Sequence, residues 1–206
     1  MRNITIHLIE NRIKSAEKGR IFVPSDFSDI ASDDAIRKSL SRFTRAGILD
    51  RVYRGIYRKP NFNAFLNREI PATPDELAEA IARSKHWTIG PEGERALNQL
   101  GLSTQVPANY RYISDGPTKS LIYEGIEVKF IHRSSRSLCG NTRKTIMIME
   151  SLRTIGRERI DLSIRRMIYN KCTENELVDL LRASKTATSW LRTEINSILA
   201  LKEFAG

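Results

Sequence analysis

The pattern of apolar and polar positions is most informative near the front of the chain. Ile36, Leu40 and Phe43 recur at i, i+4 and i+7, which predicts a helix with one buried face. Ser32 stands where the N-cap of this helix is expected, and Gly47 stands where the helix should end. The other faces of the helix are rich in basic side chains, so we expect them to lie in water.

The residues after this helix, 48–59, alternate apolar and basic side chains around Gly55, which predicts a β-hairpin. Upstream, an isoleucine stripe predicts a first helix over 3–18, and Pro24 can open a short second helix. This order of helices and hairpin is typical of a winged helix-turn-helix. Residues 1–60 are therefore predicted to form a DNA-binding domain.

A break in periodicity follows the hairpin. Residues 59–72 contain two prolines and no helical stripe, so the domain boundary is predicted there. Phe62, Phe65 and Leu66 are expected to fasten this linker to one of the two domains.

The remaining residues, 71–206, are predicted to form a mixed domain. Thr73 with Glu76 and Thr173 with Glu176 form capping boxes, which begin helices. Strands are predicted at 87–89, 110–114, 119–123 and 126–132, and helices from residue 142 onward. The predicted fold class is α+β, a winged helix-turn-helix followed by a domain with a small antiparallel sheet and C-terminal helices.

The charge of the chain supports a polyanionic partner. Its formal net charge is +10, and residues 1–60 contain 13 Lys/Arg against 7 Asp/Glu. The predicted DNA-binding residues lie on the second long helix, where they meet bases or adjacent phosphates, and in the hairpin, where they meet the backbone. They are Arg37, Lys38, Ser41, Arg42 and Arg45 on the helix, and Arg51, Arg54 and Arg58 in the hairpin.

A second basic segment spans residues 133–166, with nine Lys/Arg against three Asp/Glu. Three interpretations remain open: a second nucleic-acid surface, a face for an acidic protein partner, and an ordinary solvated pair of helices. The basic residues are Arg133, Arg136, Arg143, Lys144, Arg153, Arg157, Arg159, Arg165 and Arg166.

Three stretches of the sequence resemble a known family. The run AIRKSLSRFTRAGILDRVYRGIYRKP is similar to the N-terminal winged helix of AbiEi-type antitoxins from type IV toxin–antitoxin systems. The segments IPATPDELAEAIAR and LNQLGLSTQVPANYRYISDG resemble the continuation of one branch of that family. The resemblance covers residues 19–115.

The resemblance implies a repressor that binds inverted repeats of double-stranded DNA in its own promoter. It also implies neutralisation of a cognate nucleotidyltransferase-like toxin, with or without a stable complex, by the part of the chain beyond residue 71. The alternative is a stand-alone winged-helix regulator whose C-terminal domain serves oligomerisation or ligand sensing.

A third interpretation is a metal-dependent nuclease. Asp115 followed by Glu127 and Lys129 on a later strand is similar to the PD-(D/E)xK arrangement, in which two carboxylates hold a divalent metal. Ordinary turn chemistry at Asp115 and an ordinary exposed strand face also explain these residues. The protein is therefore expected to be a binder and not an enzyme.

The sequence shows no signature of a cofactor site or of a membrane span. His7, His86 and His132 have no metal-ligand spacing, and no Gly-rich phosphate loop is present, so no metal or cofactor is expected. Cys139 and Cys172 are predicted to be reduced thiols. No apolar run approaches the length of a membrane span, and the N-terminus does not resemble a signal peptide. These features predict a cytoplasmic protein without membrane association.

Overall fold

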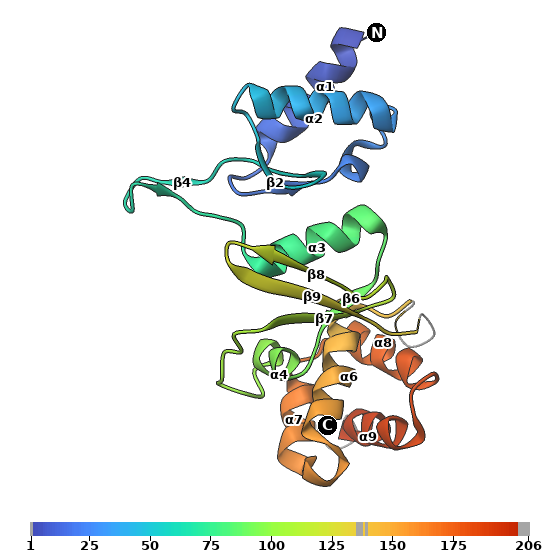
Figure 1. Ribbon diagram of the computed structural model, residues 1–206. Helices are drawn as coiled ribbons and strands as arrows, with labels where there is room; N and C mark the ends of the chain where they lie inside the picture. The colour runs from blue at the N-terminus through green and yellow to red at the C-terminus, as the bar shows by residue number, and fades with distance from the viewer. Residues whose placement is uncertain (1, 135–137, 139, 202–206) are drawn as a thin grey trace. The chain divides into compact units, whose positions relative to one another are not determined.

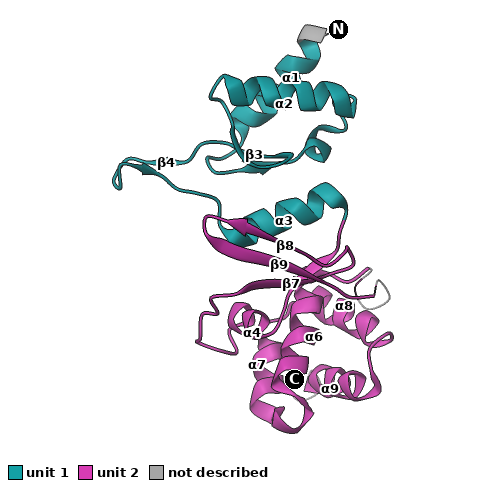
Figure 2. Cartoon of the chain, viewed as in Figure 1, with its two compact units in different colours: residues 1–86 teal, residues 87–206 magenta. Residues whose placement is uncertain are grey.

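The computed structural model describes residues 2–134, 138 and 140–201. The chain divides into two compact units, residues 1–86 and 87–206, shown in separate colours in Figure 2. Each unit contains both helices and strands, and this α+β structure confirms the predicted fold class.

Unit 1 (residues 1–86) begins with a winged helix-turn-helix (Figure 1). Its elements are α1 (Arg2–Ser15), β1 (Ile21–Phe22), the 3₁₀ helix η1 (Pro24–Phe27), α2 (Asp33–Arg45), β2 (Asp50–Tyr53) and β3 (Ile56–Arg58). The strands form an antiparallel sheet in the order β1-β3-β2. The short second helix is thus a single 3₁₀ segment opened by Pro24, as the missing N–H of proline favours.

The core of unit 1 lies between the helices and the sheet. The predicted stripe of α2 is buried, because Ile36, Leu40 and Phe43 are each at most 4 % exposed. They pack with Ile9 and Ile13 of α1 and with apolar residues of the sheet. Ser32 occupies the predicted N-cap position with extended backbone, but its side chain makes no capping hydrogen bond.

Two further elements complete unit 1. A hairpin of β4 (Phe62–Asn63) and β5 (Arg68–Glu69) leads to α3 (Pro74–Lys85), which begins at the predicted capping box. Helix α3 packs against β1, β3 and η1. The division between the units therefore falls after residue 86 and differs from the boundary expected at 60–71.

An arginine explains why α3 joins unit 1. Arg83 Nε donates to Asp26 Oδ1 at 3.1 Å, and its guanidinium also donates to the carbonyl of Ile21 at 3.0 Å. Asp26 in turn accepts a hydrogen bond from the backbone N–H of Val23 at 2.8 Å. These partners are more than fifty residues from Arg83 in sequence, so no local pattern indicates the pairing.

Unit 2 (residues 87–206) contains a four-stranded sheet in the order β6-β7-β9-β8. Its first elements are β6 (Ile89–Pro91), α4 (Glu94–Leu100), β7 (Tyr110–Ser114), β8 (Lys119–Tyr123) and β9 (Ile126–His132). The positions of β7, β8 and β9 agree with those predicted, whereas β6 lies two residues later than the strand expected at 87–89. One pairing differs from the expected antiparallel sheet: β9 lies parallel to β7 and antiparallel to β8.

Helices follow the sheet, as predicted. They are α6 (Arg143–Ile155), η2 (Arg157–Arg159), α7 (Leu162–Asn170), α8 (Glu174–Ser184) and α9 (Ser189–Leu199). An apolar core joins α6 to α4 and to the last three α-helices, with Ile148, Leu152 and Ile195 fully buried. Among the described residues, no helix has the length and apolarity to span a bilayer.

Candidate nucleic-acid interface

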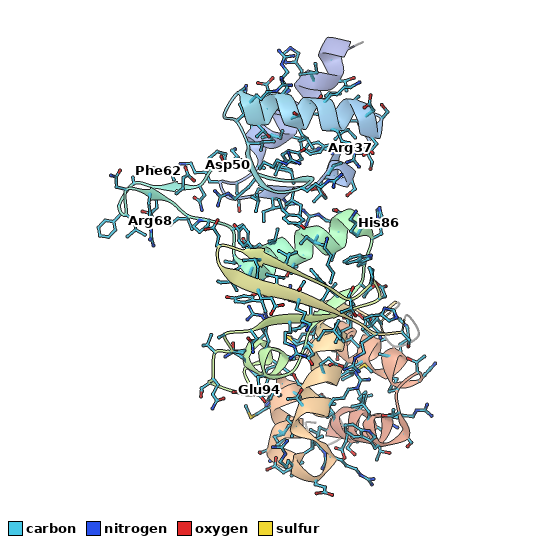
Figure 3. All side chains as sticks on the ribbon, in the orientation of Figure 1. Arg37, Asp50, Phe62, Arg68, His86 and Glu94 are labelled. Carbon is cyan, nitrogen blue, oxygen red and sulfur yellow. The ribbon has the colours of Figure 1, made fainter. Side chains whose placement is uncertain are left out.

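The exposed face of α2 carries all five residues predicted from this helix. Arg37, Lys38, Ser41, Arg42 and Arg45 are each exposed, opposite or beside the buried stripe. Arg37 lies near the N-terminal end of the helix (Figure 3). Its Nε donates to Asp33 at 2.9 Å, and Lys38 Nζ donates to Asp34 at 2.7 Å. The structure thus brings the predicted cations together on one face, two of them in intrahelical ion pairs.

These ion pairs hold the cations only weakly. Both join residues at i and i+4, and all four side chains are at least 60 % exposed. Pairs of this kind contribute about 0.3–0.5 kcal/mol because water and salt screen them. Arg37 and Lys38 can therefore exchange their carboxylate partners for stronger anions at little cost.

A groove runs between α1 and α2 on the same side of unit 1. Its volume is about 850 Å³, and Lys38, Arg42 and Arg45 lie along it. Three of its four charged lining residues are basic, and a concave surface with such an excess of positive charge attracts polyanions. The remaining lining residues are Thr5, Ile6, Ser32, Asp34, Ala35, Ser39 and Ala46. The contribution of α1 was missed from the sequence, because it depends on how the two helices cross.

The wing carries two further exposed arginines. Arg51 is on β2 and Arg54 is in the turn between β2 and β3, and both are exposed. Gly55 has a positive φ of 76°, which an L side chain rarely adopts, so glycine allows the tight reversal that presents Arg54. These two side chains stand where a wing contacts a phosphate backbone.

Arg58 does not belong to this surface, and its predicted role was wrong. Its residue is 7 % exposed, and its guanidinium donates to the carbonyl of Ile70 and, at 3.1 Å, to Asp50 Oδ2. Glu69 lies 3.7 Å away as a further partner. Arg58 therefore connects the base of the β4–β5 hairpin to the sheet. Its guanidinium is buried against these partners and is not accessible to a nucleic acid.

Three arginines of the second basic segment pair with buried carboxylates. Glu150 on α6 is 3 % exposed, and it pairs with Arg153 and, at 3.7 Å, with Arg133. Arg165 binds Glu194, which is 6 % exposed, through two nitrogens at 2.9 and 2.8 Å. These three arginines stabilise buried carboxylates.

The other members of that segment have mixed environments. Arg143 donates to Gln99 at 3.2 Å, and Arg159 donates to the carbonyl of Thr154 at 3.1 Å. Lys144 is half-buried, whereas Arg157 and Arg166 are exposed. Arg136 lies outside the described residues. Among the described residues, Arg157 and Arg166 are therefore the best remaining candidates for a second basic surface.

The residues considered for a nuclease are not brought together. Asp115 follows β7 and Glu127 is the second residue of β9, and the parallel register pairs Ser114 with His132 and Tyr110 with Val128. The two carboxylates therefore stand at opposite ends of the strand pair, roughly 20 Å apart, whereas ligands of one metal lie within about 2.6 Å of it. Asp115 Oδ1 instead accepts the backbone N–H of Thr88 at 2.8 Å.

The remaining titratable residues have structural surroundings. His132 Nδ1 lies 2.9 Å from the carbonyl of Gly116, and His86 is the left-handed C-cap residue of α3. Burial raises the pKa of the Cys172 thiol, which disfavours the reactive thiolate. The described ranges contain no cluster of three metal-ligating side chains. Cys139 lies outside those ranges.

The fold and the surface of unit 1 define a winged-helix protein with an exposed cationic helix and wing. The model of a family of unknown function, DUF6088, matches residues 8–180, a span that includes parts of both units. The chain belongs to the DUF6088 family. A search of curated proteins finds no match.

Proposed function

We propose that the protein binds double-stranded DNA sequence-specifically through unit 1. The exposed cationic face of α2, within a winged helix, is the observation that carries this proposal. In this arrangement α2 enters the major groove, where Arg37, Lys38, Ser41 and Arg42 meet bases or adjacent phosphates. Arg45, Arg51 and Arg54 then contact the backbone on either side.

The energetics of the surface favour this assignment. The pairs of Arg37 with Asp33 and of Lys38 with Asp34 are solvent-exposed, so breaking them costs little. Each cation that moves to a phosphate releases condensed counterions, and the affinity gains a salt dependence of about 0.9 per phosphate. Asp33 and Asp34 remain useful in the free protein, because they complement the positive end of the helix dipole.

We further propose that the protein is a cytoplasmic antitoxin that represses its own operon at inverted repeats. The similarity of residues 19–115 to AbiEi-type antitoxins supports this role, and its toxin would be a nucleotidyltransferase-like enzyme. The antitoxin activity is assigned to the C-terminal part of the chain, and DNA binding to unit 1. The alternative is a stand-alone winged-helix regulator, which would have no toxin gene beside it.

DNA binding is tested with promoter DNA from the protein's own gene, by measuring affinity across a range of salt concentrations. The triple variant Arg37→Ala/Arg42→Ala/Arg54→Ala is expected to bind more weakly and to lower the salt slope by about one to three units. The matched control Lys171→Ala/Arg182→Ala/Lys185→Ala removes the same charge from exposed positions in unit 2. Its slope should stay close to that of the wild type.

Two outcomes would contradict the DNA-binding surface. One is a folded triple variant of unit 1 that binds with unchanged salt dependence. The other is an equal loss in the control triple variant, which would mean that bulk charge and not α2 governs the affinity.

The antitoxin role is tested by growth rescue beside a promoter reporter. A fragment of residues 87–206 should relieve toxicity of the neighbouring nucleotidyltransferase without repressing the promoter, and residues 1–86 should do the reverse. Rescue by residues 1–86 alone would reverse this division of labour. Failure of the full-length chain to rescue growth would favour the stand-alone regulator.

A further inference from the structure

The β4–β5 hairpin, named the arm (residues 61–70), exposes more apolar surface than any function above explains. Phe65 is 94 % exposed, and Phe62 and Leu66 are 49 % and 47 % exposed. The expectation that these three side chains fasten the linker to a domain was wrong. Figure 3 labels Phe62 and Arg68 on the two strands of the arm, which extends away from the sheet of unit 1.

Hydrogen bonds and ion pairs hold the base of the arm in place. Arg58 holds its base through Ile70, Glu69 and Asp50, and the backbone N–H of Asn61 donates to Glu69 at 2.9 Å. At the tip, Asn63 accepts the N–H of Leu66 at 3.0 Å, in a side-chain turn typical of asparagine. The structure therefore presents Phe65 and Leu66 outward on a built turn.

A hairpin of this size needs a surface to cover it. Its two strands share only two registered residue pairs, and two-stranded hairpins are at best marginally stable in water. Exposed apolar clusters of this kind usually mark protein–protein contacts.

The position and charge of the arm favour a protein over a nucleic acid. Strand β3 begins at the wing turn and ends at Arg58, so the arm leaves the sheet at the end opposite the wing. The arm contains one arginine and one glutamate and carries no net charge. Nucleic acids are bound mainly through an excess of cations, and the single arginine of the arm is balanced by its glutamate.

Unit 1 contains one other exposed apolar patch. Ile4 and Leu8 on α1 are 64 % and 50 % exposed and lie one helical turn apart. In the described part of unit 1, these two residues and the three of the arm are the large apolar side chains with high exposure. The described part of unit 1 thus carries two exposed apolar patches on different elements.

We propose that two copies of this chain form a two-fold dimer in which the arm of each copy packs on Ile4 and Leu8 of the other. A two-fold axis covers both patches on both copies at once, because the arm of the first copy meets α1 of the second and the arm of the second meets α1 of the first. The five side chains expose roughly 550 Å² per copy, so two copies would bury roughly 1,100 Å² of apolar surface before any polar rim is added. Stable interfaces bury about 1,200–2,000 Å² in total.

The proposal does not depend on DNA binding. None of its five residues belongs to the cationic surface of α2 and the wing, so the dimer and that surface can act together. A dimer would also match an inverted repeat, in which each copy meets one half-site.

The test is the oligomeric state of the full-length protein, measured by sedimentation equilibrium. The wild type should dimerise at micromolar concentration. Phe65→Ser/Leu66→Ser and Ile4→Ser/Leu8→Ser should each raise the dissociation constant at least about 100-fold, because each removes four apolar side chains from the dimer. The control Val106→Ser changes an apolar residue that is 83 % exposed in unit 2, and it should leave the dimer intact. Circular dichroism confirms that each variant is folded.

A mixing experiment identifies the pairing. A heterodimer of the two double variants keeps one wild-type contact between an arm and an α1, so the mixture should dimerise more strongly than either variant alone. The wild type is expected to dimerise at micromolar concentration. If it is still monomeric at about 100 µM, a concentration about 100-fold higher, the proposal is overturned. A mixture in which dimerisation does not recover also overturns the proposal. It would mean that the arm packs on the partner's arm and α1 packs on the partner's α1.

Discussion

Two segments of this chain carry the same formal charge and use it differently. Residues 1–60 and residues 133–166 each have a net charge of +6. In the first, the cations of α2 lie on an exposed face and pair only with exposed carboxylates one turn away. In the second, Arg153 and Arg165 pair with Glu150 and Glu194, which are 3 % and 6 % exposed. A count of charges therefore does not predict the cations that are available to a partner.

The difference follows from where the carboxylates lie. A buried carboxylate without a counter-ion is strongly unfavourable, so an arginine beside it is held in place. An exposed carboxylate is already solvated and holds its partner by a fraction of a kcal/mol.

The largest effect is expected for Arg133→Ala/Arg153→Ala. It leaves the carboxylate of Glu150, which is 3 % exposed, without its two arginine partners, and this should lower the free energy of unfolding by about 3 kcal/mol. Chemical denaturation measures the change. The control Arg157→Ala/Arg166→Ala removes two exposed arginines from the same segment and should change stability by less than about 0.5 kcal/mol. Equal effects of the two double variants would remove the distinction drawn here.

Arg58→Ala should be the next largest change. It leaves the carbonyl of Ile70 without its donor, whereas Asp50 and Glu69 are 46 % and 47 % exposed and can be rehydrated. We expect a loss of about 1–2 kcal/mol in the free energy of unfolding. The salt slope of DNA binding should stay unchanged, and a slope lowered by a full unit would return Arg58 to the interface.

The stripe of α2 was predictable because it is local. The spacing of Ile36, Leu40 and Phe43 alone predicts a buried face. Because that face is buried, the five polar residues predicted from the other faces of this helix are exposed. Capping boxes at Thr73 and Thr173 were predictable for the same reason, since their partners lie three residues away.

Features that depend on distant residues were not predictable. The alternation around Gly55 could not reveal that Arg58 finds Ile70, twelve residues away. Consecutive strands suggested a simple antiparallel order, but β9 inserts between β7 and β8. The exposure of Phe65 was missed because an apolar residue in a linker is normally assumed to be covered.

The exposed arginines of the second segment should contribute little to DNA binding. Arg157→Ala/Arg166→Ala is expected to lower the salt slope by less than one unit in the assay used for unit 1, because Arg157 lies in η2 and Arg166 lies on α7, so they do not share one helix face. A decrease near two units would establish a second nucleic-acid surface and make the two basic segments alike.

A smaller, pH-dependent effect is expected where α1 meets η1. Arg12 donates two hydrogen bonds of 2.7 Å to Asp29, and these bonds lower the pKa of that carboxyl below its ordinary value of 3.8. A lowered folded-state pKa adds stability above about pH 4, and this stability disappears as pH falls through the folded value. Asp29→Asn should therefore destabilise the protein slightly at pH 6 and not at pH 2. Urea denaturation at both pH values measures it, and an equal effect at pH 2 would contradict the ion-pair origin.

The smallest effect is expected for Glu127→Ala and Lys129→Ala on β9. Glu127 is exposed and Lys129 is half-exposed on the sheet, and the strand register keeps both well separated from Asp115. Each substitution should change the free energy of unfolding by less than about 0.5 kcal/mol and leave DNA binding intact. The decisive measurement is incubation of the wild type and both variants with DNA and Mg²⁺. Cleavage by the wild type that is lost in either variant would show that these residues form a catalytic site after all, because a strand surface of purely structural character has no cleavage to lose.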